Sequence, residues 1–211
     1  MADPFRHHPR LRPLIRDAET SYFRTFDVEA MRADFLARGV PADAISPEET
    51  REAGRRALLD RQPPGDLWVF AYGSLMWDPA IRFTEVRRAR VPDHARRFIL
   101  RDVWGGRGDA ERPGLMVALD RVPGAACEGL AFRIAEEAVE EETYILWRRE
   151  RIGPTYLEDL VPAETAQGPV EAVAFVADHE TDAICPDLTF EEQVTYAATG
   201  TGFLGSSLDY L

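Results

Sequence analysis

The sequence predicts an α+β fold. Residues 67–134 contain short strand-like runs of apolar and alternating residues, and one long helical pattern follows them. A further strand and a last short helix come after that helix. The chain has no internal repeat and no regular alternation of strand with helix, so the pattern favours neither a repeat array nor a doubly wound parallel sheet.

The first part of the chain has a helical pattern. Apolar residues in the segment 28–38 recur with helical spacing, which predicts one helix there. The sequence Ser46-Pro47-Glu48-Glu49 has the form of a capping box, with proline at the first helical position. We therefore expect a second helix that starts at this cap and ends at about Asp60.

A segment rich in proline separates these helices from the rest of the chain. The sequence Gln62-Pro63-Pro64-Gly65-Asp66 ends the preceding helix and is typical of a linker. We therefore expect residues 1–66 to form an N-terminal helical extension with its linker. Residues 67–211 are expected to form the main domain.

The main domain is expected to begin with strands. In one of them, Leu130, Phe132 and Ile134 alternate with other residues, as in a strand with one buried face. The sequence Val122-Pro123-Gly124 predicts the turn of a hairpin. The four strand-like runs are residues 67–71, 96–103, 115–119 and 127–134.

A long helix is expected next, from about Glu136 to Arg151. After it we expect an extended segment at residues 156–161 and a strand at residues 170–176. A helix at residues 190–198 completes the pattern. Strands and helices in this order are typical of an α+β domain.

Composition argues against several classes of function. The chain has 211 residues, with 37 acidic against 25 basic side chains and a net charge of −12. Nucleic acid and anionic membrane surfaces are therefore unfavourable partners. Residues 1–13 lack the apolar stretch of a signal peptide, and no later run is long and apolar enough to span a membrane. We expect a soluble protein of the cytoplasm.

The cysteines and histidines give no sign of a metal site. Cys127 and Cys185 are too few for a disulfide framework. The four histidines show no metal-ligand spacing, either with these cysteines or with each other. We therefore expect no structural metal ion.

Glu150 is the first candidate for catalysis. Val139, Thr143, Leu146 and Glu150 follow steps of four, three and four residues, so they share one stripe of the long helix. Burial on this apolar stripe should raise the pKa of the Glu150 carboxyl from about 4.3 toward neutrality, which suits a proton shuttle. The alternative is that Glu150, near the helix end, only pairs with a neighbouring arginine.

A strand that ends in a Gly-Ser turn is the second candidate site. In Phe70-Ala71-Tyr72-Gly73-Ser74-Leu75, glycine allows close approach of a ligand, and successive N–H groups can form an anion-binding nest. The alternative is an ordinary turn. A serine nucleophile is a poor interpretation, because the residues around Ser74 do not follow the pattern G-x-S-x-G.

A glycine-rich, charged loop at residues 104–114 is the third candidate. It joins two expected strands and opens no helix, so it is not a dinucleotide-binding fingerprint. Arg107 and Arg112 could each grip a substrate carboxylate in a bidentate manner. The alternative for each is a solvated loop charge.

Taken in order, these features resemble the ChaC-like γ-glutamylcyclotransferase family. Tyr72-Gly73-Ser74-Leu75 matches the signature of that family, and Arg149-Glu150 follows at the end of the next long helix. This co-occurrence makes the match specific, and it spans residues 67–211. The matching segments are residues 68–77, 96–98, 107–108, 112–115, 127–133, 149–150 and 205–211.

The resemblance implies a fold, a reaction and a site. The fold would be a small mixed β-barrel flanked by helices. Proteins of this branch act on glutathione, which they cleave to 5-oxoproline and Cys-Gly without a cofactor. The implied site has Glu150 as catalytic general acid/base, with substrate-binding residues Tyr72, Gly73, Ser74, Leu75, Arg107 and Tyr210.

The chain departs from the family pattern in three places. Ala71 replaces the glycine that usually precedes the tyrosine, and Ser207 stands where an asparagine is common. Residues 1–66 match no part of the family pattern. The first two departures lie close to the expected pocket and therefore bear on substrate preference.

Three other functions stay open on the sequence alone. One is a cyclotransferase whose substrate is another γ-glutamyl amine or amino acid. A second is a serine hydrolase that uses Ser74 and His94. The third is a module that binds γ-glutamyl compounds without chemistry.

Overall fold

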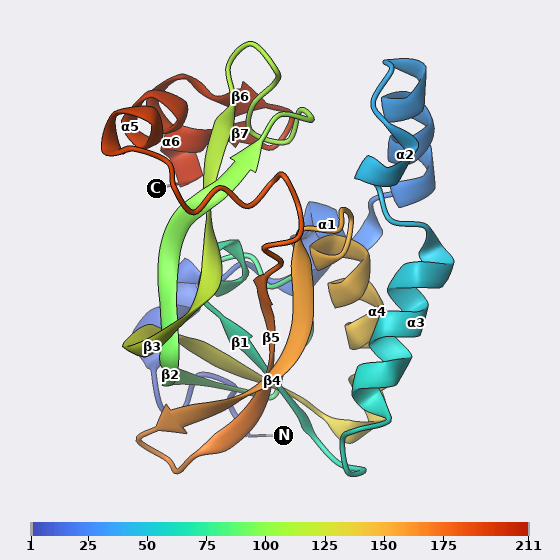
Figure 1. The fold of residues 1–211 in the computed structure, drawn as a ribbon. Helices are drawn as coiled ribbons and strands as arrows, with labels where there is room; N and C mark the ends of the chain where they lie inside the picture. Colours follow the sequence, from blue (N-terminus) through green and yellow to red (C-terminus); the bar gives the residue numbers. More distant parts are fainter. Residues whose placement is uncertain (1, 211) are drawn as a thin grey trace.

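The protein is a closed β-barrel with helices on its outside (Figure 1). The computed structural model describes residues 2–210. Within these residues, five strands close the barrel in the order β1-β3-β2-β4-β5, and the parallel pairing of β1 with β5 makes the sheet mixed. The predicted α+β class and the small mixed barrel are thus confirmed. The strands are β1 (Leu67–Ala71), β2 (Glu85–Asp102), β3 (Gly114–Ile134), β4 (Tyr156–Thr165) and β5 (Val170–Ala177).

The hairpin that we predicted at residues 122–124 is wrong. Strand β3 runs straight through this segment and pairs with β2 on both sides of it. The register passes from Pro92 opposite Ala126 to His94 opposite Arg121, so the Pro-Gly signal marks a bulge. Gly124 has a φ of +80° there and donates its N–H to Asp93 Oδ1 at 2.8 Å. Both predicted strands therefore belong to one long strand.

Helix α4 (Val139–Glu150) lies beside the barrel, and a small second sheet with the C-terminal helices lies at the far end of the β2–β3 ribbon (Figure 1). The long helix predicted from about Glu136 to Arg151 is α4, and a 3₁₀ turn at Glu136–Ala138 precedes it. Figure 1 shows the long β2–β3 ribbon reaching beyond the barrel to the C-terminal elements. These elements are α5 (Phe190–Thr199), β6 (Thr201–Gly202), β7 (Gly205–Ser206) and α6 (Ser207–Tyr210).

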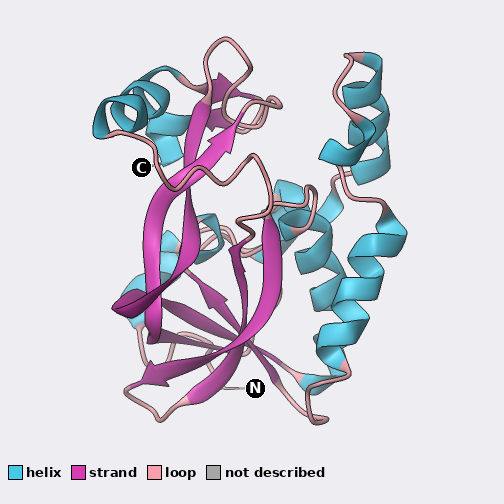
Figure 2. Cartoon of the chain, viewed as in Figure 1, coloured by secondary structure: helices cyan, strands magenta, loops and turns pink. Residues whose placement is uncertain are grey.

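The N-terminal segment, which we define as residues 2–66, lies beside the barrel. Its helices α2 and α3 stand on the same side as α4 (Figure 2). Its α-helices are α1 (Tyr22–Thr25), α2 (Val28–Ala37) and α3 (Glu48–Leu59), with 3₁₀ turns at Pro9–Leu14, Ala18–Thr20 and Ala42–Ala44.

The capping box predicted for α3 is wrong. The N-cap is Pro47, which makes no side-chain capping bond, whereas Ser46 lies one position too early. Ser46 is buried, and its backbone N–H donates to the carbonyl oxygen of Ile152 at 2.7 Å. The residue thus links the N-terminal segment to the loop after α4 and does not cap a helix.

One hydrophobic core joins the N-terminal segment to the barrel. Phe132 and Phe175 of the barrel pack in one cluster with Trp147 of α4. The same cluster contains the following residues of the N-terminal segment: Phe5, Ile15 and Leu58. None of the helices in residues 2–210 combines the length and the apolar character that crossing a membrane requires.

Candidate active site

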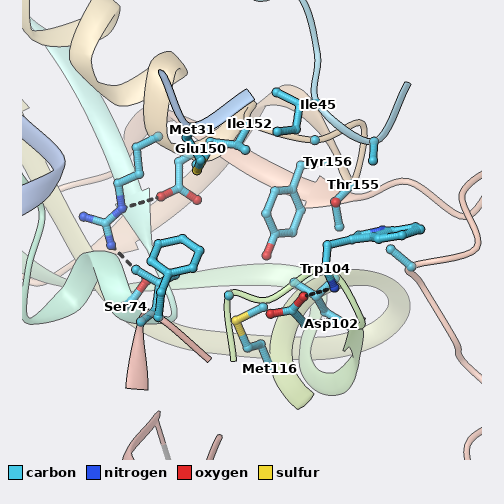
Figure 3. A pocket seen from close by; sticks show the side chains of 18 of the residues that line it. Met31, Ile45, Ser74, Asp102, Trp104, Met116, Glu150, Ile152, Thr155 and Tyr156 are labelled. Atoms are coloured by element: carbon cyan, nitrogen blue, oxygen red, sulfur yellow. Dashed lines mark hydrogen bonds and ion pairs between the residues drawn. The ribbon is translucent and has the colours of Figure 1, made fainter. Parts of the chain in front are cut away.

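A cavity of about 220 Å³ lies where the barrel, helix α4 and the N-terminal segment meet (Figure 3). The barrel contributes Asp102 from the end of β2, Met116 from β3 and Tyr156 from β4. The turn after β1 contributes Ser74, and the last turn of α4 contributes Glu150. Segments far apart in the sequence therefore build one pocket, which is typical of a ligand site.

Glu150 is one of two carboxyl groups in the cavity wall, together with Asp102. It is the last residue of α4, and its side chain is 13% exposed. Thr143 and Leu146 of the same stripe are fully buried, as the helical spacing predicts. Burial raises the pKa of the Glu150 carboxyl above its usual value, and the nearby positive charge of Arg149 offsets part of that rise.

Arg149 ties Glu150 to the turn after β1. Its Nε lies 2.9 Å from Glu150 Oε1, and its Nη2 donates to Ser74 Oγ at 2.9 Å. It also donates to the carbonyl oxygen of Asp78, and its guanidinium lies 4.1 Å from the ring centroid of Phe23. The predicted arginine pairing of Glu150 is therefore present together with its place on the cavity wall. Sequence reasoning had assigned Arg149 no role of its own.

The turn after β1 presents Ser74 to the cavity. Tyr72 is buried and donates its hydroxyl to the carbonyl oxygen of Phe175 at 2.8 Å, while Leu75 packs in the core. A Cβ on Gly73 would lie 2.7 Å from the hydroxyl oxygen of Tyr210, so any larger residue there would displace Tyr210. The side chains of Tyr72 and Leu75 shape the turn, and its backbone faces Tyr210.

Two tyrosines, Tyr156 and Tyr210, line the cavity with Glu150. Burial raises the pKa of Tyr210 to about 12, and the negative charge of Glu150 adds to the effect. The pKa of Tyr156 is raised well above its usual value, again mainly by burial. Both hydroxyls are therefore protonated at neutral pH and can donate hydrogen bonds. Tyr156 was missed at the level of sequence, where it only opened an extended run.

Arg107 lies behind Tyr210 and is not part of the cavity wall. Its Nη1 donates to the carbonyl oxygen of Ser206 at 2.7 Å. Its guanidinium lies 4.9 Å from the ring centroid of Tyr210. The other arginine of this loop, Arg112, is exposed to solvent. Arg107 can thus hold Tyr210 in place, whereas neither arginine reaches the cavity.

Asp102 is a further wall residue that sequence reasoning missed. Its side chain is buried and accepts hydrogen bonds from the backbone N–H of Trp104, at 2.9 Å, and of Arg107. Burial raises the pKa of this carboxyl, and these N–H groups offset part of the rise. Asp102 therefore fixes the shape of the glycine-rich loop beside the cavity.

The geometry gives Ser74 no general base. None of the four histidines, all of which lie within residues 2–210, lines the cavity. Nδ1 of His94 lies 2.8 Å from the carbonyl oxygen of Pro92, at the bulge in β2. In the same described residues, no group of three or more His, Cys, Asp or Glu side chains could hold a metal ion. The arrangement therefore suits proton transfer by one carboxyl group better than hydrolysis by a serine.

Comparison with known proteins adds to this geometry. A family model described as "ChaC-like protein" matches residues 67–211. The glutathione-specific γ-glutamylcyclotransferase of Escherichia coli K12 is 36% identical over 165 residues, which cover 77% of this chain and 70% of that protein. The glutathione-specific γ-glutamylcyclotransferase 1 of Danio rerio is 31% identical over 152 residues, 69% of this chain and 75% of that protein.

The fold is also similar to that of a solved yeast protein. The crystal structure of a γ-glutamyl cyclotransferase specific to glutathione from yeast matches with a TM-score of 0.61 and 18% identity. The match covers 69% of this chain and 83% of the yeast chain. At this identity the comparison shows a common fold.

Proposed function

This chain belongs to the family of ChaC-like proteins, and we propose that it is a γ-glutamylcyclotransferase that converts glutathione to 5-oxoproline and Cys-Gly. The names of the relatives in Escherichia coli and Danio rerio support this activity. The observation that carries the proposal is the position of Glu150, a buried carboxyl with a raised pKa on the wall of a cavity.

The proposed reaction is an intramolecular acyl transfer. The α-amine nitrogen of the γ-glutamyl residue attacks its own γ-carbonyl carbon and forms the C–N bond of a five-membered lactam. The bond from the γ-carbonyl carbon to the cysteine nitrogen breaks, and that nitrogen leaves as the amine of Cys-Gly. Well-oriented intramolecular reactions reach effective molarities of about 10⁵–10⁸ M, so the folding of the glutamyl chain in the cavity supplies much of the acceleration.

Glu150 would move the proton that this reaction requires. Its carboxylate takes a proton from the α-ammonium group, which creates the nucleophilic amine. The same carboxyl then delivers this proton to the departing cysteine nitrogen, so the group returns to its starting state. The second proton that the attacking nitrogen loses as the lactam forms passes to the released amine of Cys-Gly or to water. The raised pKa helps both steps, because a carboxyl of ordinary pKa holds its proton too weakly near neutral pH.

The turn after β1 and the tyrosines would hold the γ-glutamyl group. We propose that backbone N–H groups of Tyr72, Gly73, Ser74 and Leu75 bind the α-carboxylate or the developing oxyanion. Tyr210 faces this turn, where its hydroxyl can donate a hydrogen bond to the same ligand group. In this scheme Arg107 acts on substrate only through Tyr210, on whose ring it stacks.

We infer that the protein acts in a reducing compartment, the cytoplasm. Cys127 and Cys185 are both free thiols in the structure, which supports this inference. Reduced glutathione is abundant in such a compartment. The proposed partner is thus a small molecule.

The activity can be tested with purified protein and reduced glutathione, with 5-oxoproline and Cys-Gly measured by chromatography. We expect both products from the wild type and a loss of about 10²–10⁴-fold in Glu150→Gln. Glu140→Gln is the matched control, because Glu140 lies on the same helix with a side chain that is 81% exposed. Equal activity of wild type and Glu150→Gln would contradict the role of Glu150, and no product from the wild type would contradict the proposed activity.

A further inference from the structure

The cavity has an apolar half that the proposed chemistry does not use. One side of it comes from the N-terminal segment, through Phe23, Met31, Phe35 and Ile45. The facing side includes Trp104 and Phe203, which belong to the glycine-rich loop and the C-terminal hairpin. Figure 3 shows Met31 and Ile45 along the upper side of the cavity and Trp104 below them.

Ion pairs and a hydrogen bond connect the N-terminal side of this apolar half to α4, the helix that carries Glu150, and to the loop after it. Arg24, next to Phe23, is buried and pairs with Glu142 at 2.7 Å and with Glu141 at 3.0 Å. Ser46, next to Ile45, donates its N–H to Ile152, which also lines the cavity. The wall is therefore held in a fixed place relative to the catalytic helix.

The apolar half remains partly open to solvent. The side chains of Trp104 and Phe203 are 41% and 53% exposed. Phe203 packs edge-on against Phe35 of the N-terminal segment, with ring centroids 6.4 Å apart, so the two sides meet at one edge of the cavity. Aromatic side chains left in water at the mouth of a cavity gain free energy when an apolar ligand group covers them.

The cysteine side chain of glutathione leaves much of this apolar half uncovered. Its small thiol gains little from contact with aromatic and aliphatic groups, and the terminal carboxylate suits the polar part of the wall, where Arg101 lies. A bulky apolar group in the same place would be desolvated by Phe23, Met31 and Trp104. The chemistry of the wall therefore favours a larger and more apolar second residue than cysteine.

We propose that this apolar half is a subsite for a bulky apolar side chain on the residue joined to the γ-glutamyl group. This inference rests on the proposed cyclotransferase activity and names the substrate class of the same site. Two sources carry the required chemistry: a glutathione thioether with an alkyl group on sulfur, and a γ-glutamyl dipeptide of an apolar amino acid. In both, the γ-glutamyl group lies at Glu150 while the apolar side chain fills the subsite.

The test compares 5-oxoproline release from glutathione, S-methylglutathione, S-hexylglutathione and γ-glutamyl-leucine by the wild-type protein. Each buried CH₂ contributes about 0.8 kcal/mol, so partial enclosure of a hexyl group should raise kcat/KM about tenfold above the value for glutathione. S-Methylglutathione should fall between the two. The relative values for S-hexylglutathione and γ-glutamyl-leucine tell which of the two sources the subsite prefers.

Two substitutions test whether the higher kcat/KM for S-hexylglutathione arises from contacts in the subsite. Met31→Gln keeps the length of a half-buried side chain and makes it polar, so the S-hexylglutathione to glutathione ratio of kcat/KM should fall about tenfold. Phe203→Gln should lower the same ratio, and its 53% exposure means that folding does not depend on it. Leu36→Gln is the matched control on α2, because Leu36 is 40% exposed and outside the cavity wall, and it should leave the ratio unchanged.

Failure of this inference is distinguishable from failure of the proposed function. Release of 5-oxoproline from glutathione, with neither apolar substrate turned over faster, overturns the subsite alone. A ratio that responds equally to Leu36→Gln and to both subsite variants also overturns it. If none of the four compounds yields 5-oxoproline, the proposed activity is wrong, and the subsite proposal, which depends on it, is wrong as well.

Discussion

The two ends of helix α4 each bury a glutamate, yet the two carboxyl groups have very different surroundings. Glu142, in the first turn, is fully buried and accepts hydrogen bonds from Arg24 Nη1 at 2.7 Å and Nη2 at 3.0 Å. It also accepts the backbone N–H of Arg82 at 2.9 Å. Glu150, in the last turn, is 13% exposed, and among residues 2–210 its one ion-pair partner is Arg149, at 2.9 Å.

This difference shows that burial alone does not make a carboxyl group suitable for proton transfer. The N-terminal end of a helix stabilises a negative charge, and the C-terminal end disfavours it. Glu142 combines the favourable end with several donors, and its hydrogen bonds raise the pKa of Arg24. Glu150 is buried at the unfavourable end with a single partner, and this burial raises its own pKa although Arg149 lowers it in part. The first group links the N-terminal segment to α4, and the second is the candidate for proton transfer.

The largest effect on stability is expected at the structural end of the helix. Glu142→Ala leaves the guanidinium of Arg24 buried without its main partner, which should lower the free energy of unfolding by roughly 3–5 kcal/mol. Chemical denaturation of Glu142→Ala and Glu140→Ala measures this loss, since Glu140 is 81% exposed and its partner Arg55 keeps a second carboxylate, that of Glu52. Equal losses in the two variants would remove the distinction between a buried and an exposed glutamate on this helix.

The ion pair between Arg24 and Glu142 can be tested in a second way. The double variant Arg24→Met with Glu142→Leu replaces the ion pair by apolar groups and should recover most of the stability lost in Glu142→Ala. If the double variant is as unstable as Glu142→Ala, the ion pair itself stabilises the packing of the N-terminal segment. The loss in Glu142→Ala would then not be due only to a buried charge left without a partner.

An intermediate effect is expected when Glu150 loses its partner. Arg149→Met removes a charged hydrogen bond to Glu150 and one to Ser74, which should lower kcat by about 10- to 100-fold. Because the charge of Arg149 lowers the pKa of Glu150, its removal should move the acid limb of the kcat/KM profile to higher pH.

Two controls separate positioning from a general loss of structure. Arg149→Lys keeps the positive charge and should restore the position of the acid limb. Arg56→Met changes an arginine that is 72% exposed and should leave both the rate and the profile unchanged. An acid limb that stays in place in Arg149→Met would mean that Arg149 does not influence the charge state of Glu150.

The smallest effect is expected at Tyr210. Tyr210→Phe removes one hydroxyl that faces the turn after β1, and the loss of one hydrogen bond should lower kcat/KM about tenfold. Tyr196→Phe is the control, because Tyr196 lies on α5 and outside the cavity wall. If the two variants have the same rate, Tyr210 does not bind the γ-glutamyl group.

The sequence was sufficient to predict the buried carboxyl group at the C-terminal end of α4 but not the one at its N-terminal end. The position of Glu150 follows from local helical periodicity, which needs only the neighbouring turns. Glu142 lies in a run of three glutamates that has no local sign of burial, and its partner Arg24 is 118 residues away. Contacts over such distances depend on the tertiary fold, which residue spacing does not reveal.

The same reason explains the other misses and one error. Tyr156 and Asp102 reach the cavity because β2 ends and β4 begins beside it, which a one-dimensional pattern does not show. The Pro123-Gly124 signal is typical both of a hairpin and of a bulge, and only the common partner strand β2 decides between them. The family signature located the turn after β1, whereas the contribution of the N-terminal segment to the cavity had no sequence motif.

The most direct test of this account is the titration of the Glu150 carboxyl itself. Infrared difference spectra between the wild type and Glu150→Gln, recorded from acid to alkaline pH, isolate the C=O band of the protonated group. Burial favours the neutral form, so the band should persist above the ordinary glutamate pKa of about 4.3 and disappear only at higher pH. A band that is lost at or below that ordinary value would contradict the claim that this end of α4 holds a carboxyl adapted for proton transfer.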